Sequence, residues 1–240
     1  MYTSEDIFSI DAFNSFKKIF TQKKDAIVSG QPYSKGDPSS VQTALNNVLQ
    51  SQPDGILFAG YAADAGPLLS LPQIANLLPQ FKILGGSGMA DLSNYPDDQP
   101  KMERLSLTSL ASQDEWQFLH ADQLPQISEF NKNYQTIFKS NTFGPNVPLL
   151  YDAVNVLLEG YRMALANGGS DTCLPCAVQK ALQSMNGTQA WQGVTGQIAF
   201  TDKSTEPVDK VLLINVIQNR TTKTIASRGC FRVDRTDCKN

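Results

Sequence analysis

The first candidate for chemistry is an aromatic residue that lies in the turn after a short apolar run. Tyr61 comes after Ile56-Leu57-Phe58, which is flanked by turn residues on both sides. This pattern predicts a buried strand and a turn, with Asp64 available to cap a following helix. Ligands of open α/β sheets bind outside the carboxyl ends of the strands. We therefore expect Tyr61 and Ala62 to contact a ligand; a core strand with an ordinary turn residue is the alternative.

A second candidate stretch is the turn Gly85-Gly86-Ser87-Gly88, which follows the predicted strand Lys82-Ile83-Leu84. It lacks the lysine of a P-loop and the spacing of a dinucleotide fingerprint, so the sequence does not indicate phosphate binding. Exposed backbone N–H groups and the Ser87 hydroxyl can donate hydrogen bonds. We expect Gly86 and Ser87 to face a ligand, and a plain flexible turn is the alternative interpretation.

The residues give little support to catalysis. His120 is the only histidine, so a Ser-His-Asp triad would have to include it. No Gly-x-Ser-x-Gly elbow is present. We expect no enzyme activity, no cofactor and no metal, and a small α/β hydrolase that uses Ser87 and His120 is the alternative.

Four cysteines lie in the last third of the chain: Cys173, Cys176, Cys230 and Cys238. An even number near one end indicates disulfides and an oxidising compartment, and three pairings are open. Cys173 and Cys176 follow a Gly-Gly-Ser segment rather than a strand, which favours a structural pair over a redox pair. Seven residues separate the second pair, which is too many for a common zinc site.

The composition excludes several partner classes. The 240 residues are 41% hydrophobic and 18% charged, with a formal net charge of −3. They contain no basic cluster, which argues against nucleic acid and anionic membranes. No apolar run approaches the roughly 20 residues that cross a bilayer. The first residues lack the pattern of a signal peptide. A cytosolic chain and part of a longer secreted chain both fit, and the cysteines favour an extracytoplasmic location.

The order of predicted elements indicates an α/β fold. Residues 6–88 alternate between helix and strand, which predicts a parallel sheet flanked by helices. Residues 32–38 are expected to form a loop, and Pro72 to break a helix. Nothing before Asp6 is expected to supply a strand, so the sheet lacks its first one. We expect helices over about 6–22, 41–49 and 64–78, and strands at 26–28, 55–59 and 82–84.

The rest of the chain is helical and then strand-rich. Strands are expected at 105–110, 198–200, 211–217 and 222–226, with a polar loop over 201–209. Helices are expected over about 127–138, 148–167 and 173–185, and residues 111–125 are ambiguous. The longest helix has a regular apolar face. Its members are Leu150, Val154, Leu157, Leu158, Tyr161 and Leu165.

Four stretches, taken in order, resemble the periplasmic substrate-binding proteins of branched-chain amino acid transport, whose type I fold also serves in receptor ligand-binding regions. The first is the Pro-Asp strand and turn, and the second is a helix pair that ends in Tyr-Asp-Ala-Val. The third is a Gly-x-Thr-Gly-x-Ile hairpin, and the fourth is a closing strand. They occupy residues 51–61, 130–154, 193–201 and 211–218.

The resemblance implies a domain organisation. Family members have two α/β lobes joined by three crossovers, and the chain matches only the last two-thirds of their length, as if truncated at its N-terminal side. Residues 1–110 would form the second lobe without its first strand. Residues 111–190 would be helices of an incomplete first lobe. Residues 191–240 would form the last crossover and a cysteine-bearing tail.

The resemblance also implies a function and a set of contacts. Tyr61 matches a ligand contact, and Phe8 matches a tyrosine that packs on the ligand. Ser87 lies where amino-acid binders carry an acid that pairs with the ligand's ammonium group. The implied function is an extracytoplasmic solute-binding module for an amino acid or a similar small polar molecule. It would close its lobes on the ligand and serve an ABC transporter permease or a receptor.

A third hypothesis is a self-associating interaction domain. An unmatched sheet edge exposes backbone groups that favour pairing with another strand. Such an edge would make a homodimer.

Overall fold

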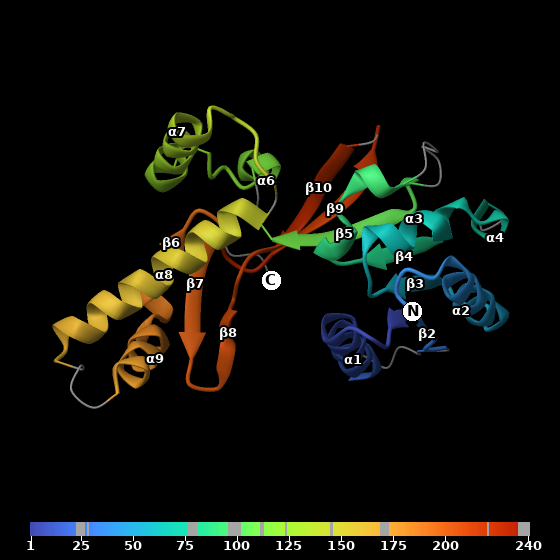
Figure 1. Ribbon diagram of the computed structural model, residues 1–240, viewed down its shortest axis with the longest axis horizontal. Coiled ribbons are helices and arrows are strands. Elements are labelled where there is room, and N and C mark those ends of the chain that lie inside the picture. Colours follow the sequence, from blue (N-terminus) through green and yellow to red (C-terminus); the bar gives the residue numbers. More distant parts are fainter. Residues whose placement is uncertain are drawn as a thin grey trace. The chain divides into compact units, whose positions relative to one another are not determined.

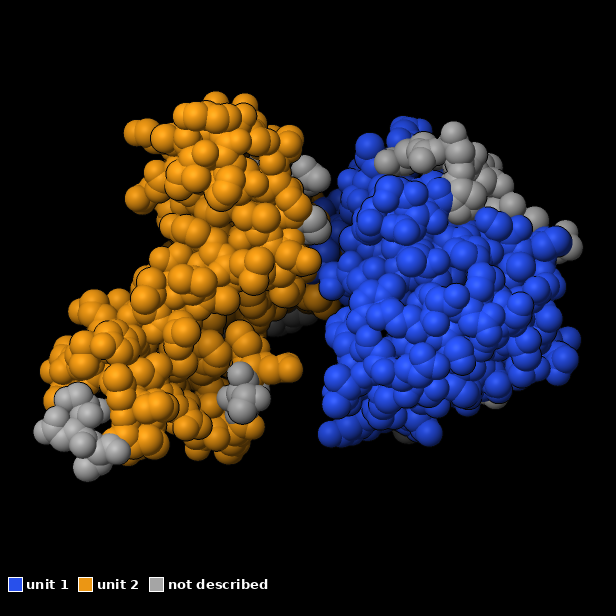
Figure 2. Space-filling view, in the orientation of Figure 1, with its two compact units in different colours: residues 1–109, 214–225 blue, residues 110–213, 226–240 orange. Residues whose placement is uncertain are grey.

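The computed structural model describes residues 1–22, 27, 29–75, 81–95, 102–110, 113–122, 124–144, 146–168, 173–219 and 221–234 (Figure 1). The chain divides into two compact units (Figure 2). Unit 1 contains Met1–Ser109 and Ile214–Ile225, and unit 2 contains Leu110–Leu213 and Ala226–Asn240. The chain therefore passes between the units three times.

Unit 1 is built on parallel strands. β3 (Gly55–Phe58), β4 (Lys82–Gly85) and β5 (Leu105–Leu110) are neighbours and run parallel. β9 (Leu212–Gln218) and β10 (Thr221–Arg228) complete a five-stranded sheet in the order β10-β9-β5-β4-β3. The predicted α/β fold with parallel strands and flanking helices is confirmed for this unit.

The described part of unit 1 contains the helices α1 (Ile7–Gln22), α2 (Pro38–Gln50), α3 (Ala62–Ser70) and the short α4 (Pro72–Ala75). Of these, α2 and α3 bury apolar faces, whereas Ser9 is the only buried residue of α1. In α2, Asp37 accepts a hydrogen bond from the Ser39 N–H at 2.9 Å, and Pro38 occupies the first turn. Leu45 of α2 and Leu68 of α3 pack in one core with Phe58 of β3.

The prediction that no strand precedes Asp6 is wrong. β1 (Tyr2–Thr3) pairs in parallel with β2 (Pro32–Tyr33), and the Ala59 N–H donates to the Met1 carbonyl at 2.9 Å. The predicted loop at 32–38 therefore contains a strand. Of the predicted strand at 26–28, only Ile27 is described, and it is not in a strand. Strands of two residues carry no alternation pattern, because long-range pairing alone defines them.

The prediction that Asp64 caps a helix is also wrong, whereas the predicted helix break at Pro72 is confirmed. α3 begins at Ala62 after Tyr61, and no side chain caps it. Leu71 has extended backbone and ends α3, and Pro72 then starts α4. The predicted helix residues 76–78 lie outside the described part of the chain.

Unit 2 packs helices against a small antiparallel sheet. Its helices are α6 (Gln113–Phe118), α7 (Pro125–Phe138), α8 (Asn146–Ala166) and α9 (Leu174–Ser184). The sheet has the order β6-β7-β8. Its strands are β6 (Trp191–Gly193), β7 (Gly196–Thr201) and β8 (Ser204–Val208). β8 lies in the stretch predicted to be a polar loop, so that prediction is wrong for these residues.

The apolar face predicted for the long helix is not the face that α8 buries. Asp152, Val156, Gly160 and Ala164 are buried, whereas the six residues of the predicted face are exposed. Helical periodicity detects an apolar stripe but does not say what covers it.

The cysteines form disulfides. Cys173 is bonded to Cys176, and Cys173 also caps α9 by accepting a hydrogen bond from the Cys176 N–H at 3.3 Å. Cys230 is disulfide-bonded too, and Cys238 lies outside the described residues. Within the described residues, no group of His, Cys, Asp and Glu side chains could hold a metal ion. No helix of this part of the chain is long and apolar enough to span a membrane.

Ser9 joins α1 to two strands, which makes a testable prediction for stability. Its buried hydroxyl accepts the Thr3 N–H at 2.8 Å and donates to the Ala59 carbonyl. Ser9→Ala leaves both partners unsatisfied, so we expect the free energy of unfolding to fall by about 1–3 kcal/mol. Chemical denaturation measures the change. Ser15→Ala, at an exposed position of the same helix, is the control, and equal midpoints for the two variants would contradict the prediction.

Candidate functional site

The parallel pairing of β3 and β4 brings the two predicted turns together. Phe58 is in register with Gly85, so both strands end at the same edge of the sheet. Tyr61 follows β3, and Ser87 begins the 3-10 helix η1 (Ser87–Met89) after β4. A Cβ atom placed on Gly88 would lie 3.3 Å from the Tyr61 ring and 2.9 Å from the Gly60 carbonyl oxygen. The backbone of the second turn therefore packs directly on the Tyr61 ring.

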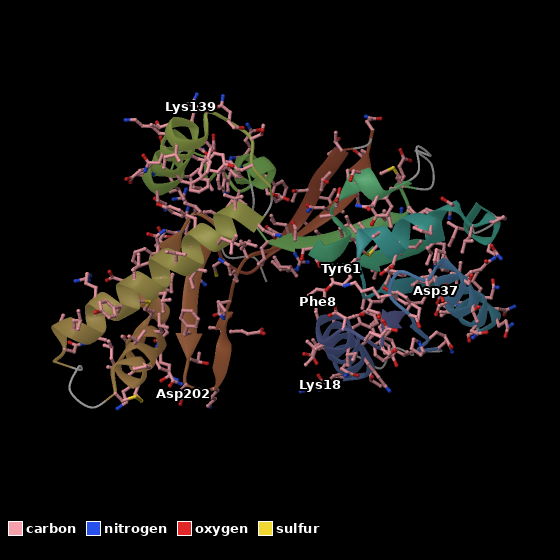
Figure 3. The ribbon with its side chains drawn as sticks, viewed as in Figure 1. Phe8, Lys18, Asp37, Tyr61, Lys139 and Asp202 are labelled. Carbon is pink, nitrogen blue, oxygen red and sulfur yellow. A yellow bond between two sulfur atoms is a disulfide. The ribbon has the colours of Figure 1, made fainter. Side chains whose placement is uncertain are left out.

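Phe8 joins this edge from the start of α1. The Phe8 and Tyr61 ring centroids are 6.1 Å apart and the planes are tilted by 39° (Figure 3). Phe8 remains 46% exposed, so its ring offers apolar surface to the solvent side. Ser87 is exposed and Gly86 is half-buried. These are the positions at which the sequence predicted ligand contacts.

Ala62 differs from the other predicted contacts. Its side chain is only 3% exposed and belongs to the core of unit 1. A ligand at this edge could meet the backbone of Ala62 but not its methyl group. Ala62 is the first residue of α3, and its small side chain fits where this first turn packs against the core.

Two charged residues that the sequence did not identify as ligand contacts, Asp6 and Lys35, lie against Tyr61. The Tyr61 hydroxyl donates to Asp6 Oδ2 at 2.7 Å. Lys35 Nζ lies 3.6 Å from the same oxygen and 4.2 Å from the centroid of the Tyr61 ring. Asp6 Oδ1 accepts the Phe8 N–H at 2.9 Å, so the carboxylate also holds the first turn of α1. The sequence predicts a helix that starts near Asp6, but it does not predict the contact of Asp6 with Tyr61.

The hydrogen bond between Tyr61 and Asp6 shifts the pKa of both groups. It is the main reason why the pKa of the Asp6 carboxyl lies below its usual value, and backbone N–H groups and Lys35 act in the same direction. The same bond raises the pKa of the Tyr61 hydroxyl. The edge therefore combines the Asp6 carboxyl, the Tyr61 hydroxyl that donates to it and the Lys35 side chain beside both.

Asp64 holds the loop that carries Lys35. It is buried and accepts hydrogen bonds from the Tyr33 hydroxyl at 3.3 Å and from the Gly36 N–H at 2.9 Å. Burial and the Asp64 charge raise the pKa of Tyr33, so its hydroxyl stays protonated and remains a donor. The contact positions the loop beside Tyr61, because Lys35 lies between the two tethered residues.

The triad alternative finds no support within either unit. Ser87 belongs to unit 1, and His120 belongs to unit 2, where it is exposed in a turn after α6. Neither unit holds both members of the pair.

Unit 2 has a polar centre that the sequence analysis did not identify. Asp152 of α8 is buried and accepts the Val194 N–H at 2.9 Å and the Thr195 N–H at 2.7 Å. Lys210 Nζ donates to the Thr195 carbonyl at 2.9 Å. Burial lowers the pKa of Lys210 to about 8, and the Asp152 charge opposes this shift. These bonds fasten α8 to the hairpin of β6 and β7.

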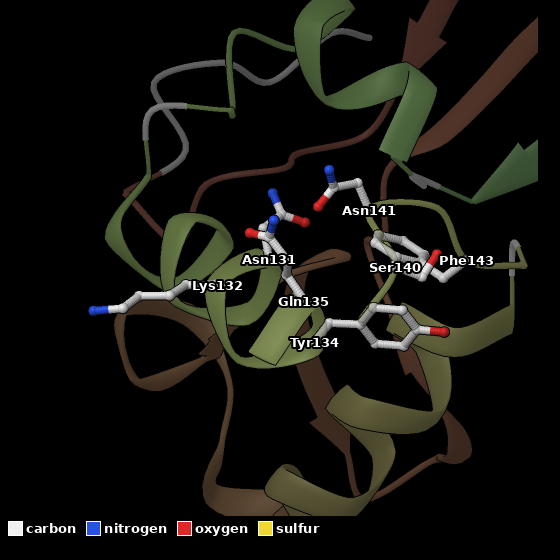
Figure 4. Close-up of a pocket in the computed structure, with 7 residues that line it drawn as sticks. All are labelled: Asn131, Lys132, Tyr134, Gln135, Ser140, Asn141 and Phe143. Atoms are coloured by element: carbon white, nitrogen blue, oxygen red, sulfur yellow. The ribbon is translucent and has the colours of Figure 1, made fainter. Parts of the chain in front are cut away.

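Hollows lie on unit 2 at several places, one of them a pocket of about 460 Å³ lined by residues of α9, β7 and β8 among others. A groove of about 620 Å³ runs beside the polar centre and has mainly apolar walls that include Val156, Leu182 and Phe200. A pocket of about 340 Å³ lies at the end of α7 (Figure 4). Amide, hydroxyl and aromatic groups line it: Asn131, Lys132, Tyr134, Gln135, Ser140, Asn141 and Phe143.

Comparison with known proteins identifies the fold. No family model and no curated protein matches the chain. Among solved structures, a leucine-binding protein of Thermotoga maritima aligns with a TM-score of 0.71 and 19% identity over 94% of this chain. An extracellular ligand-binding receptor of Rhodopseudomonas palustris gives a TM-score of 0.69 and 18% identity over 93%. The chain has the type I periplasmic binding-protein fold. The resemblance read from the sequence is thereby confirmed at the level of the fold.

The similarity covers only part of these proteins. A branched-chain amino acid ABC transporter protein of Rhodospirillum rubrum aligns with 21% identity and a TM-score of 0.65 over 90% of this chain. The chain spans 58% of the Thermotoga protein, 62% of the Rhodopseudomonas protein and 57% of the Rhodospirillum protein. It therefore spans roughly three-fifths of the length of these proteins.

The Tyr61–Asp6 hydrogen bond can be tested by titration. Tyr61→Phe removes the main cause of the lowered pKa, so we expect the pKa of Asp6 to move up toward its usual range. The stabilisation that Asp6 gives the folded state is present at neutral pH and is lost as the pH falls through the folded-state pKa. Carbon-detected NMR of the Asp6 carboxyl measures the shift. Tyr161→Phe in unit 2 is the control, and an unchanged Asp6 titration in Tyr61→Phe would contradict the hydrogen bond.

Proposed function

We propose that the chain is an extracytoplasmic solute-binding module that recognises an amino acid or a similar small polar molecule. It binds without catalysis and closes its lobes on the ligand. It then serves the permease of an ABC transporter or acts as the sensor domain of a receptor. The ligand-contacting residues are Phe8, Tyr61, Gly86 and Ser87, together with the backbone of Ala62.

The observation that carries this proposal is the convergence of these residues at one strand edge. Tyr61 lies against the turn after β4, and Phe8 lies 6.1 Å from Tyr61 between ring centroids. Carboxyl ends of parallel strands are the common place for ligands in α/β sheets. The edge combines an exposed ring with hydrogen-bond donors from Ser87, which suits a small molecule with one apolar part and one polar part.

The charges at this edge favour a zwitterionic ligand. Asp6 and Lys35 form an ion pair at 3.6 Å, and the Lys35 side chain is half exposed. Surface ion pairs of this kind contribute only about 0–1 kcal/mol, so they exchange partners at little cost. An amino acid would offer its ammonium group to Asp6 and its carboxylate to Lys35. In this way Asp6 supplies the acidic group that Ser87 lacks.

The comparisons support the same class of ligand and location. The Thermotoga relative is described as leucine-binding, and the Rhodospirillum relative as a branched-chain amino acid ABC transporter protein. The Rhodopseudomonas relative is described as an extracellular receptor. The disulfide between Cys173 and Cys176 fits an oxidising compartment.

Calorimetric titration of the chain with leucine, isoleucine and valine tests the proposal. We expect saturable binding of at least one of them and a roughly tenfold weaker affinity in Phe8→Ala, because about 1.5 kcal/mol of apolar contact with the ligand is lost. Stability should change little, since Phe8 is already exposed. Phe118→Ala, at an exposed position of α6, is the matched control.

Two outcomes would contradict the assignment of this edge. One is saturable binding that is equally strong in Phe8→Ala and in the unaltered chain. The other is a loss of affinity in Phe118→Ala that matches the loss in Phe8→Ala. Either result would place the ligand away from the strand edge of unit 1.

A further inference from the structure

The ammonium group of Lys35 lies against an aromatic ring and a carboxylate at the same time. Lys35 Nζ is 4.2 Å from the centroid of the Tyr61 ring and 3.6 Å from Asp6 Oδ2. A ring face attracts a cation within about 6 Å of its centroid, and a carboxylate adds a charged partner. The Tyr61 hydroxyl donates to the same Asp6 oxygen at 2.7 Å, which holds ring and carboxylate together. The two groups therefore have the chemistry of a site for a primary ammonium group.

The positions of Asp6 and Tyr61 do not depend on Lys35. Asp6 Oδ1 accepts the Phe8 N–H at 2.9 Å, which fixes the carboxylate at the start of α1. The backbone at Gly88 packs on the Tyr61 ring, since a Cβ atom there would lie 3.3 Å from it. The Asp6 side chain is 19% exposed, whereas the Lys35 side chain is 49% exposed. The carboxylate and the ring would therefore stay in place if the Lys35 side chain moved away.

The turn that carries Lys35 is anchored to the core of unit 1 on both sides. Asp64 accepts a hydrogen bond from the Tyr33 hydroxyl at 3.3 Å and another from the Gly36 N–H at 2.9 Å. Gly36 has a φ of 74°, in the left-handed region that favours glycine. The Lys35 backbone is thus held beside Tyr61, and a group that is tethered in this way has a high effective concentration at its target.

The contacts of Lys35 are weak enough for a ligand to replace them. Water hydrates a half-exposed ammonium group, so an ion pair and a cation–π contact at such a position each contribute little. A ligand brings an additional contact, because the Phe8 ring lies 6.1 Å from the Tyr61 ring between centroids and is 46% exposed. A small molecule with an ammonium group and an apolar part can therefore displace the lysine.

We propose that Asp6 and the Tyr61 ring form a subsite for the primary ammonium group of the ligand, and that Lys35 occupies this subsite until the ligand displaces it. The released Lys35 side chain then pairs with the ligand's carboxylate at the same edge. This inference rests on the ligand site proposed for unit 1, and adds that the chain competes with its own ligand. An amine without a carboxylate meets only the competitor, whereas an amino acid also gains a partner in Lys35.

Calorimetric titration with 3-methylbutylamine tests the competition, because this amine has the side chain and ammonium group of leucine without the carboxylate. We expect it to bind Lys35→Met roughly fivefold more tightly than the unaltered chain, since the competing ion pair and cation–π contact are removed. The affinity for leucine should rise less, because leucine also loses the partner of its carboxylate. Lys18→Met, at an exposed position of α1, removes the same charge elsewhere and should leave both affinities unchanged (Figure 3).

Proton NMR of Lys35 tests the occupancy of the subsite directly. In the unliganded chain, the ring current of Tyr61 should shift the Lys35 Cε protons upfield, because the ammonium group lies over the ring. Saturation with 3-methylbutylamine should remove this shift. Lys35 Cε protons that show no upfield shift in the unliganded chain, or that keep it at saturation, would overturn the proposal.

The titrations separate this inference from the proposed function. Equal affinity of the unaltered chain and Lys35→Met for 3-methylbutylamine overturns the inference, as does an equal gain in Lys18→Met. The proposed function stands in that case if leucine binds and Phe8→Ala weakens it. If the amine binds more tightly to Lys35→Met but leucine does not bind at all, the ammonium subsite stands and the assignment of an amino acid falls. Binding of neither ligand contradicts both.

Discussion

The parallel pairing of β3 with β4 is the constraint on which the candidate site depends. Their register places Phe58 beside Gly85, so the chain leaves both strands at one edge. Everything else at the site builds on this edge. Tyr61 is held there by its bond to Asp6, which also fixes the first turn of α1. Asp64 then ties down the loop of Lys35 through Tyr33 and Gly36. A shift of the register would separate the two turns and disrupt the contacts around Tyr61.

The sequence predicts those parts of the fold that have a local signal. The strands at 55–58 and 82–85 are short apolar runs between turn residues, and α7, α8 and α9 have clear helical periodicity. β1, β2 and β8 were missed because they are too short or too polar to show alternation. Contacts with distant segments define β1 and β2, and antiparallel pairing with β7 defines β8. The break at Pro72 was predicted correctly, since it follows from the geometry of one residue.

The residues of the candidate site also divide into those that the sequence could predict and those that it could not. Tyr61 and Ser87 could be proposed from their positions relative to predicted elements, and Phe8 from the family resemblance. Asp6 and Lys35 could not, because Asp6 meets Tyr61 across 55 residues and Lys35 reaches both from a loop. The apolar face predicted for α8 shows another limit of periodicity. Its spacing marks an apolar face, but burial depends on what packs against it, and within unit 2 α9 packs against a different face of α8.

The central claim is that a small polar ligand binds at the carboxyl edge of β3 and β4. The most direct measurement is amide NMR of the isotope-labelled chain during titration with leucine. The account predicts saturable shifts at Phe8, Tyr61, Ser87 and Gly88, with smaller changes elsewhere in unit 1. Shifts confined to unit 2, such as the groove beside α8 or the pocket at the end of α7, would contradict it.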